Sequence, residues 1–319
     1  MLRAFLLYLS SASWARRLVS GWGLSRRVAS RFVAGDTLDD AVRAVQALNQ
    51  AGLNATLDHL GENVNTAEDA AHATEDYLGL LDRIQETKLR ANVSLKLTQL
   101  GLLLDFEMCA ANLKRIVDRA KSYGTFVRID MEDSAILEDT LRIYQRLKES
   151  GATNLGVVIQ SYLYRSDDDI HRLAEEGTPV RLVKGAYDEP AKIAYPKKND
   201  VDRAFDRETE MLIQGAISHG SVPVSADGRT PPIPAIATHD HLRIEYACNI
   251  AKEKGLPKEG LEFQLLHGIR TELQRTLLKD GYPVRIYVPY GTEWYPYFMR
   301  RLAERPANLW FFVSNLIRG

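Results

Sequence analysis

Cysteine is scarce in this sequence of 319 residues, and the two that occur form no motif. Cys109 and Cys248 lie inside helix-like segments and lack the spacing of a metal or redox site. We therefore expect buried thiols in a protein of a reducing compartment. Net charge is nearly absent too. The 41 basic and 42 acidic residues give −1, which offers no reason to propose a nucleic acid as partner.

A continuous apolar run of about 20 residues, the length of a membrane span, is also missing. The first 35 residues contain no acidic side chain but hold six arginines around the short apolar run AFLLYL. A secretory signal would need a longer apolar stretch. Three interpretations of this basic arm stay open: a helix packed on the domain, an interfacial contact with a membrane, or a cleaved targeting segment.

From residue 54 onward, short β-rich runs alternate with longer segments of helical periodicity, two of which end at Gly124 and Gly220. The strand-like runs cover residues 54–61, 92–97, 125–131, 155–163, 179–187, 233–240, 261–268 and 284–291. Eight alternations without hairpin signals predict a parallel sheet, and eight strands close a barrel. We predict an α/β fold, a (β/α)8 TIM-type barrel at 53–319 with a C-terminal helix, after an N-terminal helical arm at 1–52.

Polar side chains gather where the predicted strands end. In this architecture active sites assemble at the C-terminal ends of the strands. A ring of charges there would be costly to bury without a function. The ring consists of Glu62, Lys96, Asp130, Glu132, Gln160, Arg181, Lys184, His239, Asp240 and Tyr287.

Two chemistries compete for this ring. The motif THDH (238–241), with Asp130 and Glu132, could belong to a metal-dependent hydrolase, but His241 is expected to begin the next helix, so we predict no metal site. Rossmann and Walker motifs are missing, so any dinucleotide would be bound by the barrel itself. The surplus of cations favours an anionic substrate beside an organic cofactor. A binding-only scaffold would not explain charged groups at so many strand ends.

An ordered set of motifs runs along the predicted barrel. It comprises LGE (60–62), SLKL (94–97), RIDMED (128–133), QSYLYR (160–165), RLVKGAY (181–187), ATHD (237–240), FQLLHGIR (263–270), RIYVPYG (285–291) and YFMRRLAERPAN (297–308). Together these motifs resemble the proline dehydrogenase family over roughly residues 35–315. The resemblance implies a flavoenzyme that oxidises L-proline to 1-pyrroline-5-carboxylate, the first step of proline catabolism to glutamate. The chain length is similar to that of the monofunctional bacterial type.

The resemblance also implies a substrate pocket. The proline carboxylate would be clamped by Lys96, Arg300 and Arg301, and the ring would be walled by Tyr287, Tyr297 and Leu266. Asp130 is implied to lie near the substrate and beside Lys96, where the two opposite charges would orient the site. The acceptor of the amine proton stays open.

The implied cofactor is FAD, lying across the C-terminal face of the barrel. Its contacts would come from Met131, Gln160, Arg181, Lys184, Gly185, Ala186, Thr238 and His239. Arg181 would act in catalysis because a cation beside the flavin stabilises the anionic reduced ring. Gly185 would allow close approach of the backbone to the cofactor.

The segment WYPYFMRRLAERPAN (294–308) poses a choice of partner for Arg300. Glu304 is four residues away and could form an ordinary surface pair. The resemblance instead implies that Glu62 pairs with Arg300 and gates the pocket, leaving Glu304 to brace Arg301. Electrons would pass to a quinone. We expect a cytoplasmic protein, with peripheral contact at the inner face of the membrane through the basic arm as an alternative.

Overall fold

Eight parallel strands form a closed barrel in the computed structural model, which describes residues 31–61 and 64–304, with side chains as far as Met299. The strands are β1 Asn54–His59, β2 Ala91–Leu95, β3 Val127–Ile129, β4 Leu155–Gln160, β5 Val180–Val183, β6 Pro234–Ala237, β7 Glu262–Leu266 and β8 Val284–Tyr290. They pair in sequence order, and β8 closes on β1 over six residue pairs. The predicted (β/α)8 barrel is confirmed, and each strand begins and ends within or one residue outside its predicted run.

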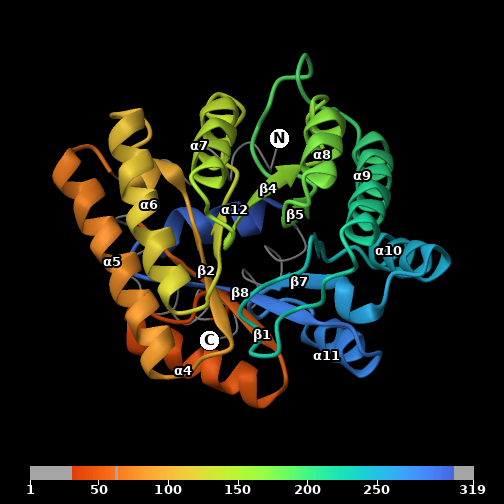
Figure 1. Ribbon diagram of the computed structural model, residues 1–319, viewed down its shortest axis with the longest axis horizontal. Coiled ribbons are helices and arrows are strands. Elements are labelled where there is room, and N and C mark those ends of the chain that lie inside the picture. Colours follow the sequence, from red (N-terminus) through yellow and green to blue (C-terminus); the bar gives the residue numbers. More distant parts are fainter. Residues whose placement is uncertain (1–30, 62–63, 305–319) are drawn as a thin grey trace, which may run out of the picture.

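Helices surround the strands (Figure 1). They are α4 Leu38–Gln50, α5 Ala67–Glu86, α6 Phe106–Ser122, α7 Leu137–Glu149, α8 Ser166–Glu175, α9 Lys198–Ser218, α10 His241–Lys254, α11 Thr271–Lys279 and α12 Trp294–Glu304, with short 3₁₀ turns at Leu97–Leu100 and Lys258–Gly260. The expected stops after α6 and α9 are confirmed, since Gly124 and Gly220 adopt positive φ values of 62° and 81°. Within the described residues, no helix is both long and apolar enough to cross a bilayer.

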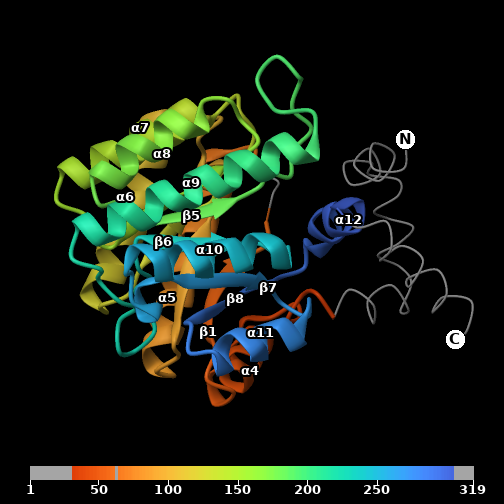
Figure 2. The ribbon, with the colours of Figure 1, turned by 90° about the vertical axis from the view of Figure 1, so that its right-hand side faces the viewer.

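Two helices stand apart from the regular ring. Helix α4, the described part of the predicted N-terminal arm, lies against β1 and β8. Thr37 and Asp40 start it with a capping box, each accepting a hydrogen bond from the other's backbone. Helix α12 follows β8 and lies across one end of the barrel instead of beside it (Figures 1 and 2). The division at residue 52 stays a prediction.

The two thiols lie on outer helices. Cys109 on α6 is buried, and this burial raises the pKa of its thiol to about 12. Cys248 on α10 is half-buried. Both are free thiols, and the expectation of burial holds fully for Cys109 and in part for Cys248.

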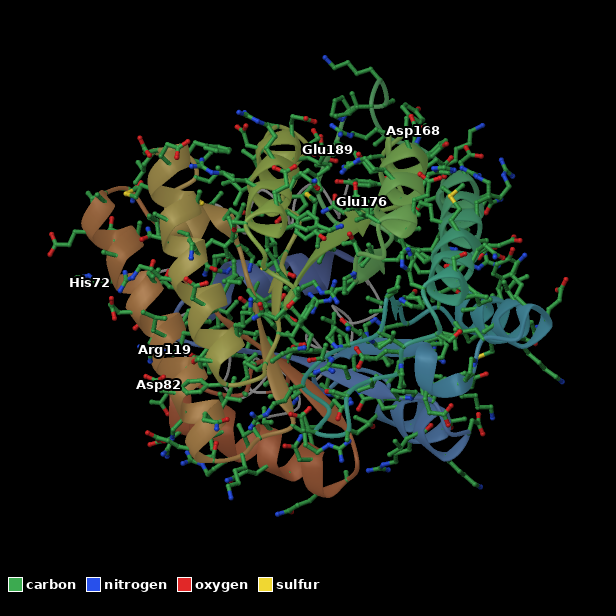
Figure 3. All side chains as sticks on the ribbon, viewed as in Figure 1. His72, Asp82, Arg119, Asp168, Glu176 and Glu189 are labelled. Carbon is green, nitrogen blue, oxygen red and sulfur yellow. The ribbon has the colours of Figure 1, made fainter. Side chains whose placement is uncertain are left out.

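The apolar core lies between the strands and the helices, not inside the barrel. Leu57, Val93 and Ile129 are fully buried and alternate along their strands with polar residues. Outside this core, neighbouring helices are joined by exposed ion pairs such as Arg119 of α6 with Asp82 of α5 (Figure 3). Exposed pairs of this kind add little stability, so the apolar layer holds the helices in place.

The barrel interior is polar. Arg285 is 1% exposed, and its Nε and Nη2 atoms donate to the two oxygens of Glu262, each at 2.9 Å. Gln264 Nε2 donates to Glu262 Oε1 at 2.6 Å, and Gln264 Oε1 accepts from Arg181 Nε. We call these four residues the polar column. It runs from the start of β8 towards the C-terminal ends of the strands.

A loop between α9 and β6 closes the N-terminal end of the barrel beneath the polar column. Arg285 Nη2 donates to Gly228 O at 2.8 Å, and Asn92 Nδ2 donates to Arg229 O at 2.9 Å. Gly228 has φ +70°, and a Cβ atom there would lie 2.1 Å from Asn54 Oδ1. The position therefore requires glycine for its backbone conformation and for space.

Replacing Gly228 by alanine should destabilise the fold strongly. The positive φ costs about 1–2 kcal/mol, and relief of the overlap with buried Asn54 costs about 1–3 kcal/mol more. The matched control is Gly220→Ala, because Gly220 has φ +81° and open space around it. Equilibrium denaturation should therefore show a larger loss for Gly228→Ala. Equal losses for the two variants would contradict the close packing of this loop.

Candidate active site

Charged and hydroxyl-bearing side chains from β2, β5, β8 and the end of β3 meet at the C-terminal end of the polar column. Arg181 of β5 donates from Nη1 to Asp130 Oδ1 at 2.6 Å, and Ser94 Oγ donates to the same oxygen at 2.6 Å. Tyr287 of β8 donates towards the other Asp130 oxygen at 2.7 Å. Asp130 follows β3 directly, so its carboxylate projects into the barrel mouth. The predicted residues Asp130, Arg181 and Tyr287 are thus brought together.

Asp58 of β1 also belongs to this cluster, although the sequence reasoning missed it. It is 0% exposed, lies 3.3 Å from Lys96 Nζ, and its Oδ2 atom is 2.6 Å from the Tyr287 hydroxyl oxygen. Lys96 and Asp130 were expected to pair with each other. Among the described residues, Asp130 forms an ion pair with Arg181, and Lys96 forms one with Asp58. The alternation of NATLDH along β1 could have revealed Asp58 as an inward-facing residue.

The cluster holds Arg181 rigidly. Its guanidinium lies 5.3 Å from the centre of the Tyr287 ring, donates to Asp130 and Ser94, and is tied to Gln264 below. A guanidinium keeps its charge and has a fixed fork of donors. The arrangement therefore presents one oriented cation at the mouth.

Tyr287 keeps its phenolic proton in this environment. Burial raises its pKa well above the usual value, and the neighbouring Asp130 and Asp58 carboxylates raise it further, against the opposing effect of Arg181. The predicted role of Tyr287 as a wall of the pocket is therefore joined by a role as a hydrogen-bond bridge between two carboxylates.

Several residues predicted to contact a cofactor lie at neighbouring strand ends. Gln160, at the end of β4, is 3% exposed and donates from Nε2 to Met131 O and Glu132 O. Its buried Oε1 atom has no hydrogen-bond partner among the described residues. A buried acceptor without a donor is costly, so this oxygen suits a ligand that carries an N–H group.

Lys184 follows β5 and is anchored by acids of the two next helices. Its Nζ atom forms an ion pair with Asp202 of α9 and another with Asp240, at 2.7 Å from the latter. Although burial raises the pKa of Asp240, hydrogen bonding and charge from Lys184 lower it to about 2. Lys184 is therefore a fixed cation beside the mouth.

Glycine is required at position 185 because the backbone lies against the Tyr162 ring. Gly185 has φ +111°, and a Cβ atom would lie 2.3 Å from Tyr162 Cδ1. The close approach of Gly185 to a cofactor stays a prediction, and the Tyr162 ring is a second reason for glycine at this position. Ala186 follows in the same connection between β5 and α9.

His239 is oriented through its backbone neighbours. Its Nε2 atom accepts a hydrogen bond from the Leu266 N–H of β7 at 3.1 Å, which orients the ring. Thr238 accepts from Asp240 N, and Asp240 caps α10 at Leu242 N. His241 begins α10, as predicted. In residues 31–61 and 64–304, no three metal-ligating side chains form a group.

The remaining predicted residues lie on or beyond α12. Tyr297 is buried on this helix, at 6% exposure. Arg300, Arg301 and Glu304 lie in helix α12, but the structure describes only their backbone. Glu62 lies wholly outside the described residues. The predicted gate between Glu62 and Arg300 therefore stays a prediction.

The fold and this cluster define a class. The chain is an α/β-barrel protein whose mouth holds fixed cations, two carboxylates and a protonated tyrosine at the strand ends, where barrel enzymes carry out catalysis.

Comparison with known proteins places the chain within that class. A family model described as proline dehydrogenase matches residues 41–313, so the chain belongs to the proline dehydrogenase family. It is 41% identical over 318 residues to proline dehydrogenase 1 of Bacillus subtilis, with all of both chains covered. It is 38% identical to proline dehydrogenase of Deinococcus radiodurans, covering 92% of this chain and 91% of the relative.

A solved structure supports the fold. Proline utilization A of Bdellovibrio bacteriovorus, inactivated by N-propargylglycine, superposes with a TM-score of 0.78 at 25% identity. The alignment covers 87% of this chain and 32% of that larger chain, so this chain spans about a third of it.

The polar column predicts an effect of Gln264 on the site. Gln264→Leu removes the acceptor of Arg181 Nε and the donor to Glu262, while Arg285 still pairs with Glu262. Loss of a hydrogen bond to a charged group costs about 1.5–3 kcal/mol, so kcat/KM for L-proline should fall roughly tenfold or more.

The control is Asn112→Leu, which removes a buried amide hydrogen bond to Leu100 O on the outer side of the barrel. This variant should keep kcat/KM when folded. An equal decrease in both variants would show that Gln264 acts on the fold and not on Arg181.

Proposed function

We propose that this chain catalyses the FAD-dependent oxidation of L-proline to 1-pyrroline-5-carboxylate and passes the electrons to a quinone-type acceptor. Membership of the proline dehydrogenase family supports the proposal. The observation that carries it is the placement of Lys96 and Arg181 as fixed cations around Tyr287 at the barrel mouth.

The residues at the strand ends fit a flavin. The buried Gln160 Oε1 lacks a donor among the described residues, and an isoalloxazine ring carries such an N–H group. The proposed contacts are Met131, Gln160, Arg181, Lys184, Gly185, Ala186, Thr238 and His239. When bound, FAD would supply the hydride acceptor. Arg181 would contribute a positive charge that favours the reduced anionic ring.

The chain's own side chains would bind and orient the substrate. Lys96 is held by Asp58 and would contact the carboxylate together with Arg300 and Arg301. Tyr287, Tyr297 and Leu266 would exclude water from the ring and fix its position. Asp130 would keep Arg181 in place, and Glu62 would close the pocket through Arg300.

Transfer of electrons onward would occur at a membrane. A quinone is a lipid-soluble acceptor, and the basic arm at residues 1–30 would contact anionic lipid from the inner, cytoplasmic face. This arm lies outside the described residues, so its role rests on sequence alone.

An absorption spectrum of the purified protein tests the proposal. The protein should show the two visible bands of a bound flavin, and anaerobic addition of L-proline should bleach them. D-Proline is the matched control and should leave the bands unchanged, because its carboxylate meets the clamp in the wrong orientation. A colourless protein, or one with stoichiometric zinc, would contradict the proposal.

A further inference from the structure

One hydroxyl at the barrel mouth lies between two carboxylates. The Tyr287 oxygen is 2.6 Å from Asp58 Oδ2 and 2.7 Å from Asp130 Oδ2. A phenol carries a single hydrogen and an ionised carboxylate carries none. The hydrogen of Tyr287 can therefore fill one of these two short contacts, and the other is filled only when a carboxyl group brings a second proton.

The Tyr287 hydroxyl keeps its own hydrogen, because burial and the two neighbouring acids raise its pKa. Asp130 Oδ1 already accepts hydrogen bonds from Arg181 Nη1 and Ser94 Oγ, each at 2.6 Å. Its side chain is 13% exposed at the mouth.

Apart from Tyr287, the partners of Asp58 lie farther away than those of Asp130. Lys96 Nζ lies 3.3 and 3.5 Å from its two oxygens, and the Tyr77 hydroxyl of α5 lies 3.3 Å away. Tyr290 of β8 is also close enough that, besides burial, the Asp58 carboxylate contributes to raising the pKa of its hydroxyl. Charge-assisted contacts are usually near 2.7–2.9 Å, so the Tyr287 hydroxyl at 2.6 Å is the closest partner of Asp58. Its side chain is wholly enclosed.

We propose that Asp130, Tyr287 and Asp58 form a proton relay that takes the amine proton of the substrate inward, with Asp58 as its final acceptor. The proposal rests on the proposed oxidation of proline. That reaction removes a hydride from the ring carbon, for which the flavin is the acceptor, and one proton from nitrogen. The N–H bond breaks, the proton reaches Asp130 or Tyr287 at the mouth, and an O–H bond forms at Asp58 as the phenolic hydrogen shifts across the bridge.

In the loaded relay, two hydrogens would fill the two short contacts of Tyr287. Sharing one proton between two acids through a hydroxyl avoids placing two uncompensated charges side by side. The relay leaves Lys96 available for the substrate carboxylate. Asp58 thus acts through Tyr287 and needs no contact with the substrate.

Infrared difference spectroscopy tests the relay directly. The spectrum of wild type reduced anaerobically by L-proline, minus that of the oxidised protein, should contain a new carboxylic-acid C=O band that shifts in D₂O. Reduction by dithionite without substrate should not give this band. Asp58→Asn and Tyr287→Phe should both lose it, and a pH indicator should then record about one additional proton released per turnover. Their kcat/KM should fall on the order of 100-fold.

Tyr290→Phe is the matched control, because it removes a buried phenol of the same strand that does not bridge the two acids. It should keep the band. If Asp58→Asn does not fold, Tyr287→Phe still decides the outcome. A wild type that bleaches with proline but shows no band, or a band that persists in both variants, overturns the relay alone. A wild type that does not bleach overturns the proposed function and the relay with it.

Discussion

A charge enclosed in a closed barrel must meet an opposite charge or, as buried Arg128 does, backbone carbonyls, because the cost of removing it from water is several kcal/mol. This constraint organises the interior of the molecule. Arg285 is paired with Glu262, and Glu262 also accepts a hydrogen bond from the Gln264 amide. The oxygen of the same amide accepts from Arg181 Nε. At the mouth Arg181 is matched by Asp130. Each pairing fixes the rotamer of the next side chain, so the position of the mouth is set from the bottom of the barrel upward.

The functional consequence is preorganisation. A site that binds a small zwitterion gains most from cations that are already oriented, since little ordering is then required on binding. Lys96 has a buried anchor in Asp58, and Arg181 contacts Asp130, Ser94, Gln264 and the Tyr287 ring. The same anchoring acids lie on either side of the Tyr287 hydroxyl, so the groups that fix the cations are also positioned to share a proton.

The sequence was sufficient to predict the barrel, because eight strand-like runs that alternate with helical segments fit few other folds. It also indicated Asp130, which follows β3, and Arg181 and Tyr287, which lie within β5 and β8. It did not reveal Asp58, whose position within an alternating run resembles that of an ordinary strand residue. Nor did it give the partner of Lys96 or the Tyr162 ring against Gly185, since these are contacts between distant segments that depend on the register of the strands.

The central claim is that the cluster around Tyr287 receives the substrate. The most direct measurement is a crystal structure with a proline analogue that has oxygen in place of the ring nitrogen and so cannot be oxidised to the imine. The account predicts the carboxylate within hydrogen-bond distance of Lys96 and the ring against Tyr287. An analogue bound elsewhere, with the cluster unchanged and filled by water, would contradict it.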